Sequence, residues 1–249
     1  MNESKIQWTE MTWNPVFGCT KVSPGCKNCY AERIALSMNE RMHPFHGNMW
    51  KAGREDAFKF RTKPNKLDEP LHVKTPKMIF VNSMSDLFHE DCSFGYIEQV
   101  WETMLKADWH IFQVLTKRPQ RMAAFIGSRN IPNHIWLGTS VEMRLYLNRI
   151  DELRRCRAPV AFVSFEPLLE LIGQVELAGV RWVITGGESD YKNPRPAKPE
   201  WFREIRDQCK EQGIAYFHKQ NGGSTKCRCH GAWGCRLLDG RTYDEMPKI

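Results

Sequence analysis

The chain has 249 residues, 41% of them hydrophobic and 26% charged, with a formal net charge of +7. This length and balance are typical of a folded protein with a continuous core, so we expect residues 1–249 to form a single domain. No run approaches the roughly 20 apolar residues that cross a bilayer, which excludes a helical membrane protein. The first residues lack the layout of a secretory signal, and we expect a cytoplasmic protein.

The excess of positive charge is spread along the sequence rather than massed in a tail. Such a distribution fits a folded basic face that attracts DNA or RNA. It fits ordinary surface solubility equally well. Charge alone does not separate these two explanations.

A three-cysteine motif stands near the amino end, in the segment GCTKVSPGCKNCYAE. Cys19, Cys26 and Cys29 are spaced C-x6-C-x2-C, after a predicted strand. A glycine and a Pro-Gly pair let the connecting loop fold back, so that three thiolates can face one point. The residues from Tyr30 onward have a helical pattern, and a helix N-terminus favours the thiolate form of the cysteine that precedes it.

The number of cysteines in this motif is informative. A structural zinc ion or a passive [4Fe–4S] cluster normally takes four protein ligands. Three cysteines leave one iron open, and that iron can bind S-adenosylmethionine through its amino and carboxylate groups. An electron from the cluster can then cleave the sulfonium to give a deoxyadenosyl radical. The alternative is zinc, with His43, His46 or a distant residue as the fourth ligand.

The next segment, residues 43–75, is rich in charged and aromatic residues and lacks clean periodicity. A long insertion at the mouth of a barrel usually acts as a lid or a substrate contact. A structural cover over one edge of the barrel is the other interpretation.

Six short apolar runs follow, and polar residues end each of them. Because they are continuously apolar, we interpret them as strands buried on both faces. Helical patterns separate them at residues 94–107, 141–156 and 199–212. In the second of these, Leu145, Ile150 and Leu153 share one face, with arginines on the other. The six runs begin at Lys77, His110, His134, Pro159, Val180 and Ile214.

This alternation predicts an α/β fold with a parallel sheet and right-handed crossovers. With the strand before Cys19, it favours a full or partial (β/α) barrel, and an open doubly wound sheet is the alternative. Ligands bind at the carboxyl ends of the strands in both folds. We therefore expect the strand-end residues to converge on one rim, although any one of them could be a helix cap. They are Asn82, Ser83, Ser85, Asp86, Thr116, Lys117, Arg118, Thr139, Ser140, Glu142, Ser164, Glu166, Gly186, Gly187, Glu188, His218, Lys219 and Gln220.

Nine cysteines are many for a chain expected in a reducing compartment, where clustered cysteines often indicate metal. Cys92, Cys156 and Cys209 stand alone, and we expect them to be small buried apolar residues. A second group lies in KCRCHGAWGC, within a cysteine-rich segment at about 222–249. It could bind an auxiliary cluster or zinc, it could supply Cys235 as a redox or hydrogen-donating thiol, or it could be a surface loop without a ligand. Its members are Cys227, Cys229, His230 and Cys235.

Over nearly its whole length the chain resembles the phage and prophage three-cysteine-motif proteins of the radical S-adenosylmethionine superfamily. The collinear motifs are WNPVFGCTKVSPGCKNCYAE, FVNSMSDLFHE, LTKRPQRM, WLGTSVE, SFEPLL, TGGES and LLDGRTYDEMP. The resemblance implies a partial α/β barrel with the cluster on the loop after the first strand. Three features depart from the wider superfamily: the first cysteine gap is six residues rather than three, Asn28 replaces the usual aromatic before the last cysteine, and the Gly-Gly-Glu segment comes late, at residues 186–188.

The resemblance also implies roles for individual residues. Tyr30 is expected to pack on the adenine, and Ser140 and Glu142 to contact the ribose. The catalytic candidates are Glu188, Lys219 and Cys235. Residues expected near the methionine moiety are Asn82, Ser83, Ser85 and Asp86, and further cofactor contacts are expected from Thr116, Lys117 and Glu166.

The expected substrate is a nucleic-acid base, because basic residues end several strands and the insertion carries aromatics that can stack on bases. The basic residues are Lys117, Arg118, Arg195 and Lys219, and the aromatics are Phe45, Trp50, Phe58 and Phe60. A base in duplex DNA would have to be flipped out. By family analogy, a hypermodified thymine in phage DNA is the specific candidate, altered by isomerisation or by C–C bond formation in the host cytoplasm.

The electron donor expected for such an enzyme is a flavodoxin or a ferredoxin. Two alternatives stay open on the sequence alone. One is a radical enzyme that acts on a peptide or a small metabolite. The other is a non-catalytic zinc module that binds nucleic acid.

Overall fold

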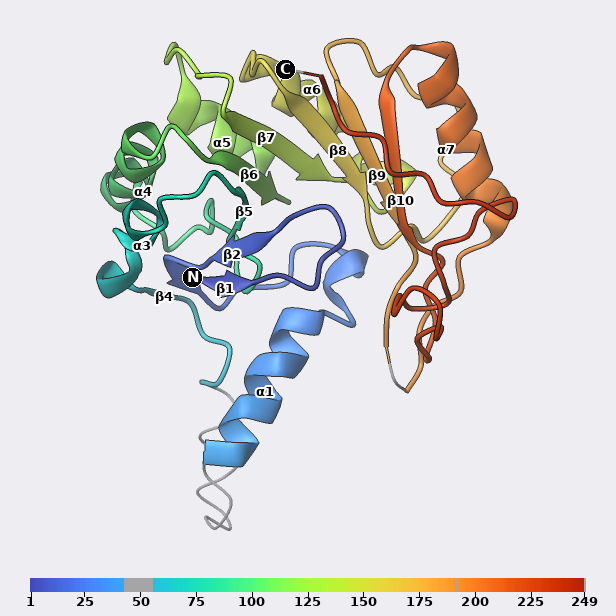
Figure 1. Ribbon diagram of the computed structural model, residues 1–249, viewed down its shortest axis with the longest axis horizontal. Coiled ribbons are helices and arrows are strands. Elements are labelled where there is room, and N and C mark those ends of the chain that lie inside the picture. Colours follow the sequence, from blue (N-terminus) through green and yellow to red (C-terminus); the bar gives the residue numbers. More distant parts are fainter. Residues whose placement is uncertain (43–55, 191, 249) are drawn as a thin grey trace.

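The computed structural model describes residues 1–42, 56–190 and 192–248. Its main feature is a mostly parallel eight-stranded sheet covered by helices (Figure 1). In the order β1-β2-β5-β6-β7-β8-β9-β10, only the pairing of β1 with β2 is antiparallel. The strands are β1 (Asn2–Glu3), β2 (Met11–Trp13), β5 (Met78–Val81), β6 (Ile111–Thr116), β7 (Ile135–Ser140), β8 (Ala161–Phe165), β9 (Trp182–Gly186) and β10 (Ala215–Gln220). The predicted α/β class and the seven parallel strands are confirmed.

From β2 to β10 the strands lie side by side in chain order, without a reversal. A doubly wound sheet reverses its strand order at a switch point, so that alternative is wrong. Among the described residues, β1 and β10 are the two edges of the sheet.

The helices and short 3-10 turns connect the strands. Besides the helix predicted from Tyr30 onward, two predicted helices are confirmed, at Phe94–Lys106 and Pro199–Glu211. Ser93 caps the first by accepting a hydrogen bond from the Tyr96 N–H, and a proline opens the second. The helices are α1 (Tyr30–Met42), α3 (Glu69–His72), α4 (Phe94–Lys106), α5 (Pro119–Ile126), α6 (Asn148–Arg155) and α7 (Pro199–Glu211), and the 3-10 turns are η1 (Pro24–Cys26), η2 (Pro64–Lys66) and η3 (Arg144–Tyr146).

The helix expected over residues 141–156 is shorter than predicted, because α6 begins only at Asn148, after η3. Leu145 lies in η3 and is 76% exposed, so its assignment to the apolar face is wrong. Arg149, expected on the polar face, is only 5% exposed. Its guanidinium donates to the buried carboxylate of Glu142 at 2.7 Å, and this ion pair holds the arginine inside.

The sheet is buried on both faces, as continuous apolar runs require. Successive residues of a strand alternate between two hydrophobic clusters: Ile79 and Val81 pack under the helices, whereas Phe80 belongs to the other cluster. This second cluster is largely aromatic. At its centre Trp182 lies 5.6–6.1 Å, between ring centroids, from four other rings. These rings belong to Trp8, Trp136, Phe162 and Phe217.

The described part of the insertion forms a support rather than a separate unit. Within it, β4 (Arg61–Thr62) pairs with β3 (Val16–Phe17) in a small antiparallel sheet. The Cys19 N–H donates to the Phe58 carbonyl at 3.1 Å, and a Cβ on Gly18 would collide with the Lys59 backbone. Residues 56–62 therefore hold the start of the cysteine loop. His43, Phe45, His46 and Trp50 lie outside the described residues.

The three isolated cysteines are buried, as predicted: Cys92, Cys156 and Cys209 are 0%, 3% and 0% exposed. In the part of the chain that the structure describes, none of the helices has the length and apolar character needed to span a membrane.

The aromatic cluster should dominate stability. Changing Trp182 to Ala leaves a cavity among four rings, and we expect the free energy of unfolding to fall by about 3–5 kcal/mol. Urea denaturation measures this quantity. The exposed Leu145→Ala serves as the control and should change it by no more than about 0.5 kcal/mol. Equal effects of the two substitutions would contradict the described packing.

Candidate functional site

The three cysteines of the amino-terminal motif lie on one loop, which we call the cysteine loop (residues 18–29). It runs from the end of β3 through η1 to the first residue of α1. The charge of Cys26 is a minor cause of the raised pKa of both other thiols. Burial is the main cause of the raised pKa of Cys19, about 12, with Asp86 acting in the same direction and Arg118 opposing it.

Cys29 directly precedes α1, as predicted. Burial raises the pKa of its thiol, while backbone N–H groups of Glu32 and Ala31 lower it. Both N–H groups belong to the first turn of α1, where backbone N–H groups have no partner inside the helix and favour negative charge nearby. The helix therefore presents two N–H groups to the Cys29 sulfur.

The first anchor of the cysteine loop is a buried ion pair between Arg118 and Asp86, which are both 6% exposed. Arg118 Nη1 lies 3.2 Å from Asp86 Oδ2 and 3.6 Å from Cys19 Sγ. Its Nη2 donates to Thr20 Oγ1 at 2.8 Å. Asp86 also accepts from the Thr116 hydroxyl at 2.7 Å. The carboxyl ends of β5 and β6 thus hold the Cys19 end of the loop.

The second anchor is Glu142, which follows β7 and is fully buried. Lys117 Nζ and Arg149 Nη1 lie 2.5 and 2.7 Å from its two oxygens, and the Ser23 hydroxyl also donates to it. Burial alone would raise the pKa of Glu142, but these two cations hold it below the ordinary value. A Cβ on Gly25 would collide with the Glu142 side chain, so the loop packs directly on this carboxylate.

The third anchor is Glu188, which follows β9 and is 4% exposed. It accepts from Asn28 Nδ2 at 2.8 Å and from Arg195 N and Nε, both at 2.9 Å. Arg195 also donates to the Pro24 carbonyl at 2.9 Å. Burial opposes ionisation of Glu188, yet the hydrogen bonds from Arg195 lower its pKa. Asn28 therefore ties the cysteine loop to the end of β9.

The end of β5 supports the loop from a fourth side. The Tyr30 hydroxyl donates to the Ser83 carbonyl at 2.5 Å, and the Tyr30 side chain stays partly exposed. The Ser85 hydroxyl donates to the Val16 carbonyl at 2.9 Å. Asn82 is 2% exposed, with its Oδ1 accepting from the Val16 N–H at 3.4 Å. Its Nδ2 has no hydrogen-bond partner in the part of the chain that is described.

The remaining predicted residues lie in three places. Lys219 pairs with Glu166 at 2.9 Å, at the ends of β10 and β8, and a Cβ on Gly186 would collide with that carboxylate. The Ser140 carbonyl accepts from Arg149 at 2.8 Å. Cys235 belongs to the carboxyl-terminal cysteine group instead. There, one ligand atom from each of four residues lies within 4.8 Å of the others, so the group could bind a metal ion; the residues are Cys227, Cys229, His230 and Cys235.

The basic residues at the strand ends are engaged internally. Lys117, Arg118, Arg195 and Lys219 each form an ion pair with a strand-end carboxylate. Their positive charges are therefore compensated within the site. Phe58 and Phe60 likewise pack against protein rings: Phe58 lies edge-on to Phe17, and Phe60 stacks on His89.

Sequence reasoning missed the roles of Ser23, Arg149 and Asn28. All three act through partners that are distant in sequence or outside any periodic pattern: Ser23 and Glu142 are 119 residues apart, and Asn28 and Glu188 are 160 apart. The periodic patterns of a sequence do not indicate such pairings. The one available signal was Gly25, whose lack of a side chain marks the close approach of the loop to Glu142.

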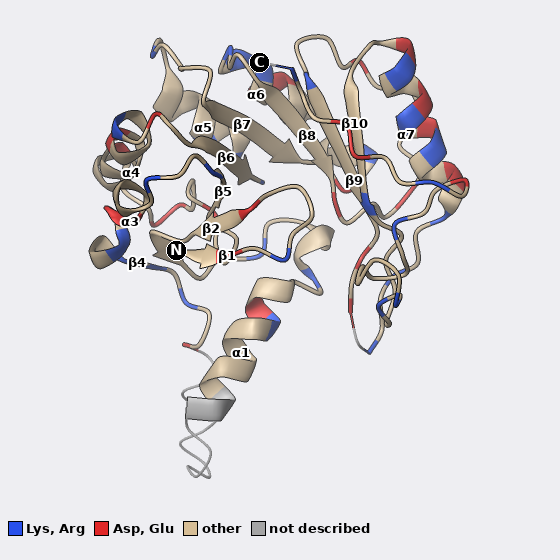
Figure 2. Ribbon diagram, viewed as in Figure 1, with Lys and Arg blue, Asp and Glu red and all other residues tan. Residues whose placement is uncertain are grey.

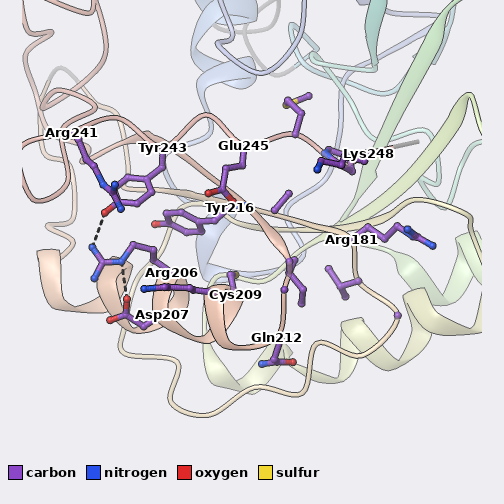
Figure 3. A pocket seen from close by; sticks show the side chains of 18 residues that line it. Arg181, Arg206, Asp207, Cys209, Gln212, Tyr216, Arg241, Tyr243, Glu245 and Lys248 are labelled. Carbon is purple, nitrogen blue, oxygen red and sulfur yellow. Dashed lines mark hydrogen bonds and ion pairs between the residues drawn. The ribbon is translucent and has the colours of Figure 1, made fainter.

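A separate hollow of about 1150 Å³ lies beside the carboxyl-terminal part of α7 (Figure 3). Arg206, Tyr216 and Tyr243 line it, at the side of the sheet where β9 and β10 begin. Arg206 is held by Asp207 at 2.8 Å and by the Tyr243 hydroxyl at 3.0 Å. The lining contains none of the predicted site residues, so we do not assign the chemistry to it.

The packing of Gly25 on Glu142 can be tested directly. Because Gly25→Ala places a methyl group against a buried carboxylate, we expect the free energy of unfolding to fall by about 1–3 kcal/mol. The cysteine loop should also react faster with a thiol reagent. Gly95→Ala, where the added Cβ meets nothing within 4 Å, is the matched control and should leave both measurements unchanged or raise stability. A Gly25→Ala protein as stable as this control would refute the described packing.

Residues 3–247 match the model of a family described as a protein of unknown function, DUF5131. No curated protein and no solved structure matches the chain. Because the match covers almost the whole sequence, the chain belongs to the DUF5131 family.

Proposed function

We propose that the chain is a radical S-adenosylmethionine enzyme that holds a [4Fe–4S] cluster on Cys19, Cys26 and Cys29 and modifies a nucleic-acid base. The observation that carries this proposal is the cysteine loop itself. Its three cysteines lie on one loop that packs against the carboxyl ends of parallel strands, where α/β folds bind their ligands.

The residues around the loop fit a three-cysteine cluster. Soft thiolates select iron–sulfur clusters or zinc. Asp86, Glu142 and Glu188 surround the loop, but each is already bound to at least one cation. None of these three carboxylates is therefore free to serve as a fourth metal ligand. The Arg118 guanidinium donates toward Cys19 Sγ at 3.6 Å, and such a hydrogen bond to a ligand sulfur would tune the potential of a bound cluster.

We also infer that the sheet is a partial (β/α) barrel. Two observations support this inference. The parallel strands follow one another in chain order, and one face of the sheet carries the aromatic cluster with Trp8, Trp136 and Trp182. Side chains fill the interior of a barrel, and here a tightly packed aromatic cluster would fill it. Water would then be excluded from one side of the reacting centre.

A cluster held on this loop would supply the electron that cleaves the sulfonium of S-adenosylmethionine. The chain's own residues would bind and orient the cofactor. The unpartnered Asn82 Nδ2 is a buried donor suited to a carboxylate or carbonyl oxygen. The half-exposed Tyr30 ring, anchored through its hydroxyl, offers a face for adenine. Glu188 and Lys219 are held in fixed ion pairs, and in this proposal they position neighbouring groups rather than transfer protons.

The case for a nucleic-acid substrate rests on basic residues other than those that end the strands. Lys27, Lys192, Lys226 and Arg228 are exposed, on three loops linked by hydrogen bonds. Asn28 donates to the Asn193 carbonyl at 3.3 Å, and the Asp190 N–H donates to the Gly223 carbonyl at 3.2 Å. On α7, in contrast, basic and acidic side chains alternate (Figure 2). The loops at the strand ends thus present the unbalanced positive charge that phosphates attract.

The reaction that fits best is an isomerisation or a C–C bond formation on a base such as a modified thymine, with reduced flavodoxin or ferredoxin as electron donor. A peptide or small metabolite as substrate is the alternative. Turnover of such a molecule in the absence of nucleic acid would favour it.

The cluster assignment predicts that Cys26→Ala abolishes deoxyadenosine formation, because one of three iron ligands is removed. The measurement is anaerobic incubation with dithionite and S-adenosylmethionine, followed by chromatography. Cys156→Ala removes a buried cysteine outside both groups and should retain the activity, at a cost of about 1 kcal/mol in packing. Deoxyadenosine formed at the parent rate by Cys26→Ala would rule out this site.

The substrate assignment predicts salt-sensitive binding of DNA. We expect the double variant Lys27→Glu/Lys192→Glu to bind DNA more weakly than the parent does. The slope of log K against log salt concentration should become less negative by about 0.9 for each phosphate that the variant no longer neutralises. Fluorescence anisotropy at several salt concentrations measures both. Lys106→Glu/Lys210→Glu, on α4 and α7, carries the same net charge and should bind as the parent does. Equal weakening in both variants, or no binding by the parent, would count against the proposal.

A further inference from the structure

The carboxyl-terminal cysteine group has the dimensions of a site for a single metal ion. His230 Nδ1 lies 3.3 Å from Cys235 Sγ and 4.0 Å from Cys227 Sγ, and Cys229 Sγ lies 3.6 Å from Cys235 Sγ. Tetrahedral zinc with ordinary bond lengths separates two sulfurs by about 3.8 Å and a sulfur from a nitrogen by about 3.6 Å. All four ligand atoms lie within 4.8 Å of one another. They therefore surround one point.

The local backbone is shaped to bring these donors together. Lys226 and Trp233 form an antiparallel bridge, and the Gly231 N–H donates back to the Cys227 carbonyl at 3.0 Å. Cys235 has a positive φ of 76°, which few residues with a side chain adopt. The preceding Gly234 packs so closely on the Gly222 carbonyl that a Cβ would collide with it. The knuckle, as we call residues 226–235, is thus a preformed turn.

The knuckle has little apolar burial of its own. Within it, only Ala232 is a buried hydrophobic residue, and Cys229 is exposed. Segments that cannot build a core commonly rely on a metal or on disulfides for stability. Three clustered and accessible thiols without a metal would also be open to oxidation.

We propose that Cys227, Cys229, His230 and Cys235 bind one zinc ion as a closed structural site, separate from the cysteine loop. A set of three thiolates and one imidazole around a single point suits zinc. An auxiliary iron–sulfur cluster fits less well, because its protein ligands bind different irons and lie farther apart than ligands of one ion. With four protein donors, no position is open for catalysis. This inference does not rest on the proposed function.

The structure also shows what the zinc ion would hold in place. Beside the knuckle, the Gly222 N–H donates to the Trp233 carbonyl at 2.9 Å. The N–H of the next residue, Gly223, donates to the Glu188 carbonyl at 2.8 Å. Glu188 is the third anchor of the cysteine loop. The zinc ion would therefore stabilise, through two consecutive glycines, the strand end that binds Asn28.

Metal analysis tests the site. In a full-length Cys19→Ala/Cys26→Ala/Cys29→Ala protein, we expect one zinc per chain by mass spectrometry, and tetrahedral thiolate spectra after cobalt substitution. Adding Cys229→Ser should lower zinc at least about tenfold, because a structural site needs its full ligand set. Adding Cys156→Ala instead should leave zinc at one per chain. If the triple variant does not fold, the same loss of one zinc is expected between the parent and its Cys229→Ser variant.

Three results would overturn the zinc assignment: no bound metal in a folded protein, zinc unchanged by Cys229→Ser, or iron with sulfide in the triple variant. None of them bears on the cluster at Cys19, Cys26 and Cys29. Hydrogen exchange tests the positioning role separately. Removing zinc with a chelator should reduce the protection of the Gly222, Gly223 and Asp190 amides at least about tenfold, while Val114 in β6 stays unchanged. Equal protection with and without zinc would overturn that role.

Discussion

The site depends on buried carboxylates at the ends of the parallel strands. Asp86, Glu142 and Glu188 are 6%, 0% and 4% exposed, and cations and hydrogen-bond donors surround each of these buried carboxylates. Each also fixes one part of the cysteine loop: the Cys19 end through Arg118, the Gly25 turn by direct packing, and the segment before Cys29 through Asn28. Breaking such a buried pair leaves an uncompensated charge, so the loop geometry is strongly determined.

Two parts of the sheet have different roles. The aromatic cluster around Trp182 fills one face of the sheet, and the polar strand ends at its carboxyl edge form the proposed site. The two cysteine groups also differ in how they are held. The cysteine loop is held by side chains from several strands, whereas the knuckle is a local turn joined to the sheet through Gly222 and Gly223. Glu188 connects the two, because it binds Asn28 of the cysteine loop and accepts from the Gly223 N–H beside the knuckle.

Much of the fold was predictable because its signals are local. Continuous apolar runs located six of the seven parallel strands, and helical patterns located α4 and α7. The prediction for residues 141–156 failed because Glu142 draws Arg149 inward, and no periodic pattern contains that ion pair. In the same way, the strand-end residues were expected to meet, but their partners were not foreseen. The basic residues expected to face nucleic acid are instead paired with those carboxylates, because a buried negative charge needs a positive charge beside it.

The most direct test of the central claim is electron paramagnetic resonance of the reduced protein after oxygen-free reconstitution with iron and sulfide. We expect about four irons on the cysteine loop and a [4Fe–4S] signal that shifts when S-adenosylmethionine is added, because the cofactor binds the iron that has no cysteine ligand. A signal unchanged by the cofactor, or a preparation that takes up no iron, would contradict the assignment.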